Sequence, residues 1–166
     1  MTALKLRLFG DPILKTEAAP VRTFGAGLRA TVYEMLEVMD DAGGVGLAAN
    51  QVGLGIRVFV YDCDGMRGHV VNPQWRPVGT ETQTGVEGCL SVPGVRGDVT
   101  RAARVLATGL DVQERPVTLL ASGLLARCIQ HETDHLDGVM FMQRMEREDR
   151  KAAMTAIRDS QWWKEN

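Results

Sequence analysis

The feature that most constrains this chain is a pair of histidines one helical turn apart. Ser122 is a favoured residue for starting a helix, apolar residues follow it with helical spacing, and Asp137-Gly138 is a typical helix end. The predicted helix runs from Ser122 to His135 and contains His131-Glu132-Thr133-Asp134-His135, an HExxH pattern. Residues four apart share one face of a helix, with Cβ atoms about 5–6 Å apart. Two imidazoles so placed can bind one tetrahedral metal ion.

The carboxylate inside this pattern indicates hydrolysis. Glu132 lies about 100° around the helix from His131, near enough to act on a water beside the metal without binding the metal itself. The pattern therefore predicts a metal hydrolase but does not fix its substrate. A zinc metallopeptidase is the first alternative, because Gly138 extends the pattern to HExxHxxG. However, Phe141 stands where the next histidine of such a peptidase is expected. Other peptidases of this kind take a glutamate from a later helix as third ligand, but Glu146 and Glu148 follow the HExxH pattern closely and lie on a charged, solvated face.

A third metal ligand must then come from elsewhere, and the candidates are His69, Cys89 and Cys128. Cys128 lies near the face of the two histidines, but one ion would be stretched to reach both ends of a stripe that spans two turns. We therefore expect Cys128 to face the core or to lie behind the ligands. His69 has no motif around it and is predicted to be a surface or turn histidine. Cys89 differs from both because its surroundings are unusual.

The rest of the chain predicts a mixed fold. An amphipathic helix is expected over residues 27–40, and a glycine-rich segment over 42–55 precedes a strand at 56–61. Further strands are expected near 69–71, 104–108 and 117–121, and a charged helix near 146–160. Because strands and helices do not alternate regularly, the pattern favours an α+β fold. We expect mainly antiparallel sheets around the HExxH helix, with an N-terminal and a C-terminal helix, in a single domain over 1–166 whose C-terminal helix and tail occupy about 146–166.

Composition excludes several classes of protein. With 45% hydrophobic residues in 166, the chain should fold without disulfides. The net charge of −2 gives no basic field for nucleic acid, and no apolar run is long enough to span a membrane. The three cysteines, in a chain with no export signal, predict free thiols in a reducing compartment, the cytoplasm.

Three segments together carry a family resemblance. Gly44–Gln51 reads GVGLAANQ, Glu87–Ser91 reads EGCLS, and Gln130–His135 reads QHETDH. These segments resemble the motifs GxGLAAxQ, EGCLS and QHExDH of peptide deformylases, in the same order. The resemblance extends from Gly10-Asp11-Pro12 to Phe141.

The resemblance implies the chemistry of the site. Cys89, His131 and His135 match the family's metal ligands, and Glu132 matches its general acid and base. The side chain of Gln51 and the backbone N–H of Leu90 match the groups that stabilise the oxyanion.

The resemblance also implies how substrate binds. Val45 and Gly46 match the loop that holds the peptide as an added strand, and Leu125 and Cys128, with the first histidine, match the wall of the methionine pocket. Arg96 matches a basic residue near the bound peptide.

The implied activity is removal of the formyl group from the N-terminal formyl-methionine of nascent bacterial proteins, with release of formate. The alternative is a related amidohydrolase that acts on a different small formamide or amide. The implied cofactor is one Fe²⁺ ion, although Zn²⁺, Ni²⁺ or Co²⁺ would also suit these ligands.

Two expectations concern supporting interactions. The implied partners are formyl-Met-peptide N-termini and, at most, a transient ribosome contact, because the C-terminal helix lacks a dense basic run. Arg101 matches a structural residue of the family. Many relatives have acidic residues where this chain has Ala42-Gly43, so Arg101 is predicted to lack one salt-bridge partner.

Overall fold

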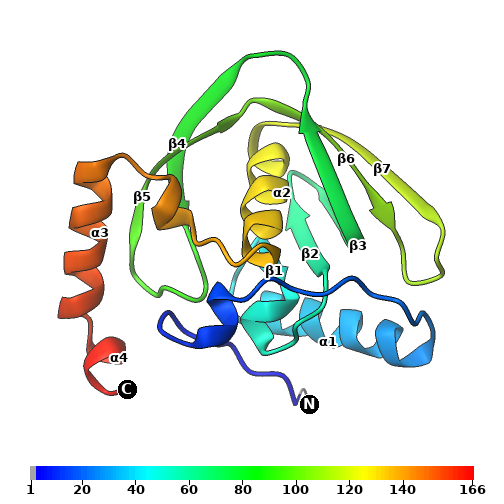
Figure 1. Ribbon diagram of the computed structural model, residues 1–166, viewed down its shortest axis with the longest axis horizontal. Helices are drawn as coiled ribbons and strands as arrows, with labels where there is room; N and C mark the ends of the chain where they lie inside the picture. The colour runs from blue at the N-terminus through cyan, green and yellow to red at the C-terminus, as the bar shows by residue number, and fades with distance from the viewer. Residues whose placement is uncertain (1–2) are drawn as a thin grey trace.

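The computed structural model describes residues 3–166 and combines helices with antiparallel sheets (Figure 1). In chain order the elements are η1 (Pro12–Lys15), α1 (Ala26–Asp41), β1 (Gly46–Ala48), η2 (Ala49–Val52), β2 (Val58–Cys63), β3 (Met66–Pro77), β4 (Thr82–Gly88), β5 (Arg96–Ala102), β6 (Arg104–Leu110), β7 (Pro116–Ser122), α2 (Gly123–Leu136), η3 (Phe141–Arg144), α3 (Arg147–Asp159) and α4 (Gln161–Lys164). Here η denotes a 3₁₀ helix.

Seven strands form two antiparallel sheets within residues 3–166. The larger sheet has the order β1-β2-β3-β6-β7, so β1 lies at its edge. The smaller sheet consists of β4 and β5 alone, which pair from Thr82↔Ala102 to Gly88↔Arg96. The predicted α+β class with antiparallel sheets is confirmed.

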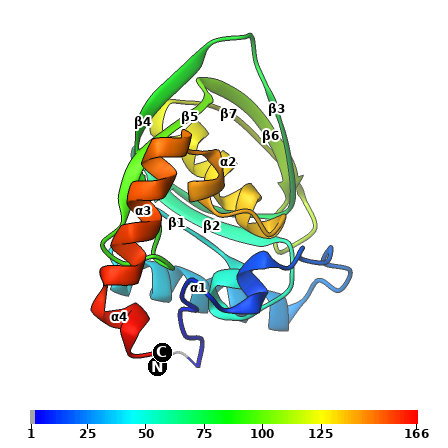
Figure 2. The ribbon, with the colours of Figure 1, turned by 60° about the vertical axis from the view of Figure 1, so that its left-hand side comes forward.

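Helix α2 lies in the middle of the molecule, with the larger sheet on one side and β4–β5 on the other (Figures 1 and 2). Every residue from Leu125 to Leu136 is buried, including the polar and charged ones. A helix that is covered on all faces must satisfy its polar side chains inside the protein. This burial is what gathers the polar groups described below.

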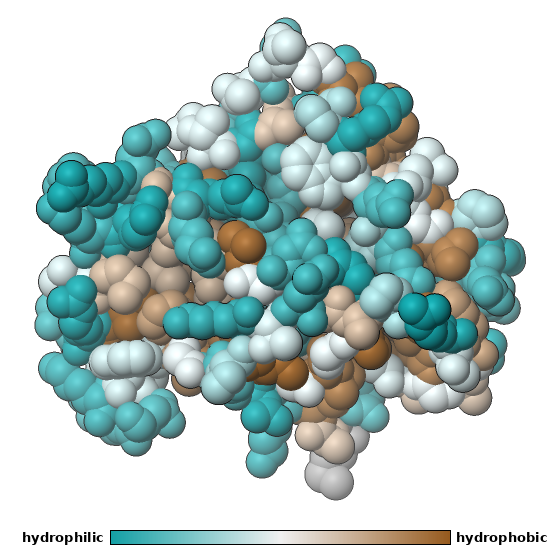
Figure 3. Space-filling model, viewed as in Figure 1, coloured by the Kyte–Doolittle hydropathy of each residue, from teal (hydrophilic) through white to brown (hydrophobic). Residues whose placement is uncertain are grey.

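The other two long helices cover the outside. In α1, residues at helical spacing are buried against the larger sheet, among them Leu28, Val32 and Met35. In α3, Ala153 and Ile157 are buried beside β5 and η3, while hydrophilic side chains predominate on its outer face (Figure 3). None of the helices in residues 3–166 combines the length and apolar character needed to cross a bilayer.

Most predicted elements exist, with two clear differences. Strands β4 and β5 were not predicted, because their sequences TQTGVEG and RGDVTRA contain few apolar residues to mark a strand. The predicted short strand at 69–71 is the middle of the long β3. The prediction for His69 is also wrong: it lies half-buried in β3, and its Nε2 accepts the N–H of Val112 at 3.0 Å.

Candidate active site

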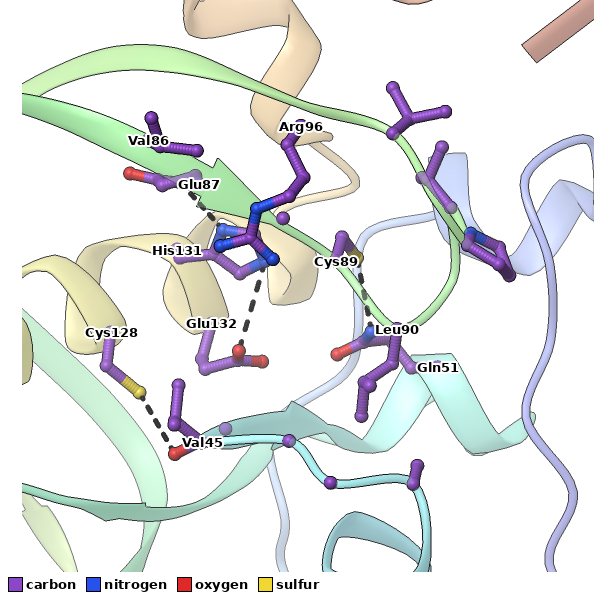
Figure 4. Close-up of a pocket in the computed structure, with 18 of the residues that line it drawn as sticks. Val45, Gln51, Val86, Glu87, Cys89, Leu90, Arg96, Cys128, His131 and Glu132 are labelled. Atoms are coloured by element: carbon purple, nitrogen blue, oxygen red, sulfur yellow. Dashed lines mark hydrogen bonds and ion pairs between the residues drawn. The ribbon is translucent and has the colours of Figure 1, made fainter. Parts of the chain in front are cut away.

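A cavity of about 610 Å³ lies where α2, the end of β4 and the segment before β1 meet. Most of the residues that the sequence marked for function line this cavity: Val45, Gly46, Gln51, Cys89, Leu90, Arg96, Cys128, His131 and Glu132 (Figure 4). The three motifs are distant in sequence, and the fold brings them to one place.

Three potential metal ligands converge beside the cavity: Cys89 and His131 line it, and His135 lies next to them without lining it. Cys89 directly follows β4, whereas His131 and His135 come from successive turns of α2. Their ligand atoms all lie within 4.8 Å of one another. Nε2 of His135 is 3.3 Å from Sγ of Cys89 and 3.2 Å from Nε2 of His131.

These separations fit one metal ion. With metal–nitrogen bonds of about 2.1 Å and a metal–sulfur bond of about 2.3 Å, tetrahedral ligands lie about 3.3–3.6 Å apart. Burial also lowers the pKa of His135 well below its usual value, which favours the neutral imidazole that binds metals. One thiolate and two imidazoles leave an open coordination position, as catalytic sites do. Cys128 is not part of this cluster, which agrees with its predicted place behind the ligands.

Glu87 fixes the orientation of His131. One carboxylate oxygen of Glu87 lies 2.8 Å from Nδ1 of His131, so the opposite nitrogen, Nε2, is left for the metal. Arg101 donates two hydrogen bonds of 2.9 Å to the same carboxylate. Burial alone would raise the pKa of Glu87, but the hydrogen bonds from Arg101 and His131 outweigh it and hold the pKa well below its usual range. Glu87 is therefore a buried carboxylate anion.

Arg101 has two acidic partners, although Ala42-Gly43 supply none. Besides its paired bonds to Glu87, it donates to Asp134 on α2 at 2.6 Å. Asp134 also accepts two hydrogen bonds from Arg144. The acidic residues absent at Ala42-Gly43 are thus not needed to pair this guanidinium.

Glu132 points into the cavity without being a ligand. Its Oε1 lies 4.0 Å from Nε2 of His131, and its buried Oε2 has no hydrogen-bond partner among the described residues. Burial is the main cause that raises the pKa of Glu132 to about 7. A carboxylate with this pKa can both accept and return a proton near neutral pH.

Gln51 supplies a fixed donor beside the metal ligands. Its Oε1 accepts the N–H of Ala48 at 2.9 Å, which turns the Nε2 amide toward the site. Nε2 donates to Ser91 Oγ at 3.1 Å and lies 3.5 Å from Sγ of Cys89. Leu90 follows Cys89 in a turn on the same side of the cavity (Figure 4). The arrangement can present two neutral donors to one oxygen.

The cavity also borders a free strand edge. Strand β1 pairs only with β2 among the described strands, and Val45 and Gly46 line the cavity where β1 begins. A peptide can bind to such an edge as an added strand. Gly46 lies so close to α2 that a Cβ there would be 2.7 Å from both Cys128 Sγ and Glu132 Oε1.

One predicted pocket residue is misplaced by a single position. Leu125 is buried in the core between α2 and the larger sheet, and it is not among the residues that line the cavity. Leu124 lines the cavity instead, because each helical residue turns by about 100° and Leu124 shares a face with Cys128. Arg96 is exposed at the rim.

The prediction from sequence missed Glu87 and Arg127. Glu87 belongs to the EGCLS motif, so its place next to Cys89 was a usable signal. Arg127 precedes His131 by one helical turn, and it lines the cavity while its guanidinium contacts Glu87.

A Cys-His-His cluster that could hold a metal ion, beside a buried carboxylate and an amide donor, fits the class of metal-dependent amide hydrolases. Comparison with known proteins narrows this class. The polypeptide deformylase family profile matches residues 3–151, and the chain belongs to this family. It is 55% identical to peptide deformylase 1 of Corynebacterium efficiens, over 98% of this chain and 99% of that protein. It is 52% identical to the peptide deformylase of Acidothermus cellulolyticus, over 98% and 89%.

Solved structures give the same result. The peptide deformylase of Synechococcus elongatus in complex with actinonin superposes with a TM-score of 0.90 at 37% identity, covering 98% of this chain and 92% of that one. The peptide deformylase of Thermus thermophilus gives a TM-score of 0.86 at 41% identity, covering 92% of each chain. The activity is that of the family, namely metal-dependent removal of the N-formyl group from nascent peptides.

Proposed function

We propose that Cys89, His131 and His135 hold one Fe²⁺ ion and that the cavity binds a formyl-methionine N-terminus beside it, in the cytoplasm. The observation that carries this proposal is the convergence of the three ligand atoms within 4.8 Å at a cavity bordered by the free edge of β1. Iron is taken from the family, since Zn²⁺, Ni²⁺ and Co²⁺ suit the same donors. The three free thiols agree with a reducing compartment.

A divalent ion at this site would lower the pKa of a water and polarise the formyl oxygen. Glu132 accepts the proton of the attacking water through its unpaired Oε2 and then delivers it to the leaving amine. Its pKa of about 7 suits both transfers. Glu132 thus acts first as a base and then as an acid.

Gln51 and Leu90 stabilise the oxyanion that forms from the formyl oxygen. The Nε2 amide of Gln51 is already oriented by its bond to Ala48, so no reorganisation is needed when charge develops. The backbone N–H of Leu90 provides the second donor. Both groups are neutral and do not compete with the three ligands for the metal.

Substrate is held by groups on opposite sides of the cavity. The peptide backbone adds to the edge of β1 at Val45 and Gly46, which border the cavity. Leu124 and Cys128 receive the methionine side chain, and Arg96 at the rim contacts the peptide beyond it.

The test of this assignment is the variant Glu132→Gln, which keeps the size of the side chain but removes its basicity. We expect it to retain one metal ion per chain, by elemental analysis, and to release formate from formyl-Met-Ala-Ser at least about 100-fold more slowly. The control is Glu146→Gln on the exposed face before α3, which should behave as the unchanged protein. Unchanged turnover by Glu132→Gln would refute the assigned role.

A further inference from the structure

The three proposed ligands come from two separate parts of the fold, the helix α2 and the small β4–β5 sheet. In the described residues this sheet is not paired with the larger sheet, so strand pairing does not fix its position. His131 and His135 belong to α2, whereas Cys89 follows β4 in the separate β4–β5 sheet. The distance between cysteine and histidines therefore depends on how this small sheet is held against the helix. Several polar side chains contribute to that contact. Figure 4 shows one such pair, Glu87 and His131.

Arg127 reaches from α2 to both strands of the small sheet. Its Nη1 donates to Oε2 of Glu87 at 2.5 Å and to the carbonyl oxygen of Val99 at 2.9 Å. Its Nη2 lies 3.4 Å from the carbonyl oxygen of Gln83. Glu87 and Gln83 belong to β4 and Val99 to β5, so one guanidinium spans the sheet. The side chain is only 9% exposed, and water therefore competes little for these bonds.

The bond to Glu87 leads directly to the ligands. The other oxygen of Glu87 meets Nδ1 of His131 at 2.8 Å, and Cys89 follows Glu87 by two residues. Arg127 itself precedes His131 by one helical turn. Arg127, Glu87 and His131 thus close a ring between helix and strand, next to the point where the cysteine ligand leaves the strand.

The other hydrogen bonds between α2 and the β4–β5 sheet lie farther from Cys89 or start from β5. At the end of the sheet opposite Cys89, Gln130 bonds the N–H and the carbonyl of Ala102, which pairs with Thr82. Near the same end, Nε2 of Gln83 donates to the carbonyl oxygen of Gly123, the first residue of α2, at 2.9 Å. Arg101 joins β5 to Asp134. Two residues of α2 pair with Glu87 among the described interactions. One is the proposed ligand His131, and the other is Arg127.

We propose that Arg127 is a positioning residue for the metal site, which fastens the β4–β5 sheet to α2 and so sets the separation between Cys89 and the two histidines. The proposal rests on the ligand roles proposed above. The consequence is that Arg127 governs metal affinity without touching the metal or the substrate's formyl group. Partners behind metal ligands typically change metal affinity by about 10–100-fold when they are removed.

The test uses Co²⁺ as the probe, because its thiolate absorption band reports a bound cysteine. Metal-free protein is titrated with Co²⁺ against a competing chelator, for the unchanged chain and for Arg127→Met, Arg127→Lys and the control Arg144→Met. Arg144 pairs with Asp134 in the same charged cluster, is half exposed, and bonds to neither strand of the small sheet among the described interactions. Urea unfolding of each metal-free variant measures stability separately.

We expect Arg127→Met to bind Co²⁺ about 10–100-fold more weakly than the unchanged protein, with an altered thiolate band. The Co²⁺ affinity of Arg127→Lys should lie between those of Arg127→Met and the unchanged protein. A lysine ammonium can reach Glu87 but cannot also bond to both strands of the sheet. Arg144→Met should keep the affinity within about threefold, since it leaves Glu87 untouched.

An Arg127→Met protein that is less stable to urea but has the affinity and band of the unchanged protein would overturn the proposal, because the role would then be structural only. If Arg127→Met does not fold, Arg127→Lys decides: full affinity with the full band overturns the proposal, and weaker binding supports it. Failure of the ligand assignment looks different, because the unchanged protein would then show no thiolate band at all.

Discussion

Replacing Gly46 with alanine tests how closely turnover depends on the position of Glu132. A Cβ at Gly46 would lie 2.7 Å from Oε1 of Glu132, 3.1 Å from its Cδ and 2.7 Å from Sγ of Cys128. Ordinary contacts begin near 3.4 Å, so the carboxylate must move by about 0.7 Å, the difference between 3.4 and 2.7 Å. Both side chains are buried on α2 and line the cavity, so any shift changes how they lie in it.

The displacement should impair catalysis much more than folding. Overpacking of this kind costs about 1–3 kcal/mol, which a domain with a typical stability of about 5–15 kcal/mol tolerates. A misplacement of about 1 Å in a reacting group can cost about 100-fold in rate, and the whole general-base contribution is about 10²–10⁴-fold. We therefore expect kcat to fall about 100-fold while the metal stays bound, because the three atoms nearest to the new methyl group belong to Cys128 and Glu132 and not to the ligands.

The assay is formate release from formyl-Met-Ala-Ser at saturating substrate, together with metal analysis and urea unfolding. Gly55→Ala is the matched control, because a Cβ at Gly55 meets no atom within 4 Å. The control should keep kcat within about twofold. Full kcat for a metal-loaded, folded Gly46→Ala protein would refute the claim that Glu132 must occupy its observed position.

Three other predictions concern single contacts. Gln51→Met keeps the size of the side chain but removes the amide donor, so kcat for formate release should fall by about 10²–10³-fold with the metal retained by elemental analysis. Trp162→Phe removes the bond from Nε1 to the carbonyl oxygen of Pro93, a cavity residue, at 2.9 Å; steady-state kinetics should show KM raised by up to about tenfold and kcat unchanged. The pKa of Glu87 is below its usual value, so the unfolded chain takes up this proton first as pH falls. The stability due to Glu87 should be present above about pH 4.3 and decline below it, and urea titrations of metal-free Glu87→Gln should show a weaker decline.

The helices were predictable because their signals are local. The expected helix over 27–40 is α1 at Ala26–Asp41, and the expected helix over 146–160 is α3 at Arg147–Asp159. The helix expected from Ser122 to His135 is α2, at Gly123–Leu136. Apolar spacing and end residues within the segment itself determine these boundaries.

Strands β4 and β5 were not predictable in the same way. Along β4 mainly Glu87 is buried, and it is a charged residue that only its three partners make tolerable there. The pairing of two polar segments and their docking on α2 are tertiary effects. The pattern of residues within either segment alone therefore does not predict the pairing or the docking.

The site residues that belong to sequence motifs were predictable, whereas those whose place depends on the packing of α2 were not. Sequence motifs named the residues that line the cavity, but a one-residue error placed Leu125 there instead of Leu124. The support from Arg127 depends on which face of α2 meets the small sheet, and that follows from the packed structure alone.

The most direct test of this account is formate release from formyl-Met-Ala-Ser by protein purified without oxygen and loaded with Fe²⁺. Unformylated Met-Ala-Ser is the control for cleavage of the peptide bond, and the Cys89→Ser variant is the control for the metal site. The account predicts rapid formate release with both peptide bonds intact, and loss of this activity in Cys89→Ser. No formate from the metal-loaded protein, or equal activity in Cys89→Ser, would contradict it.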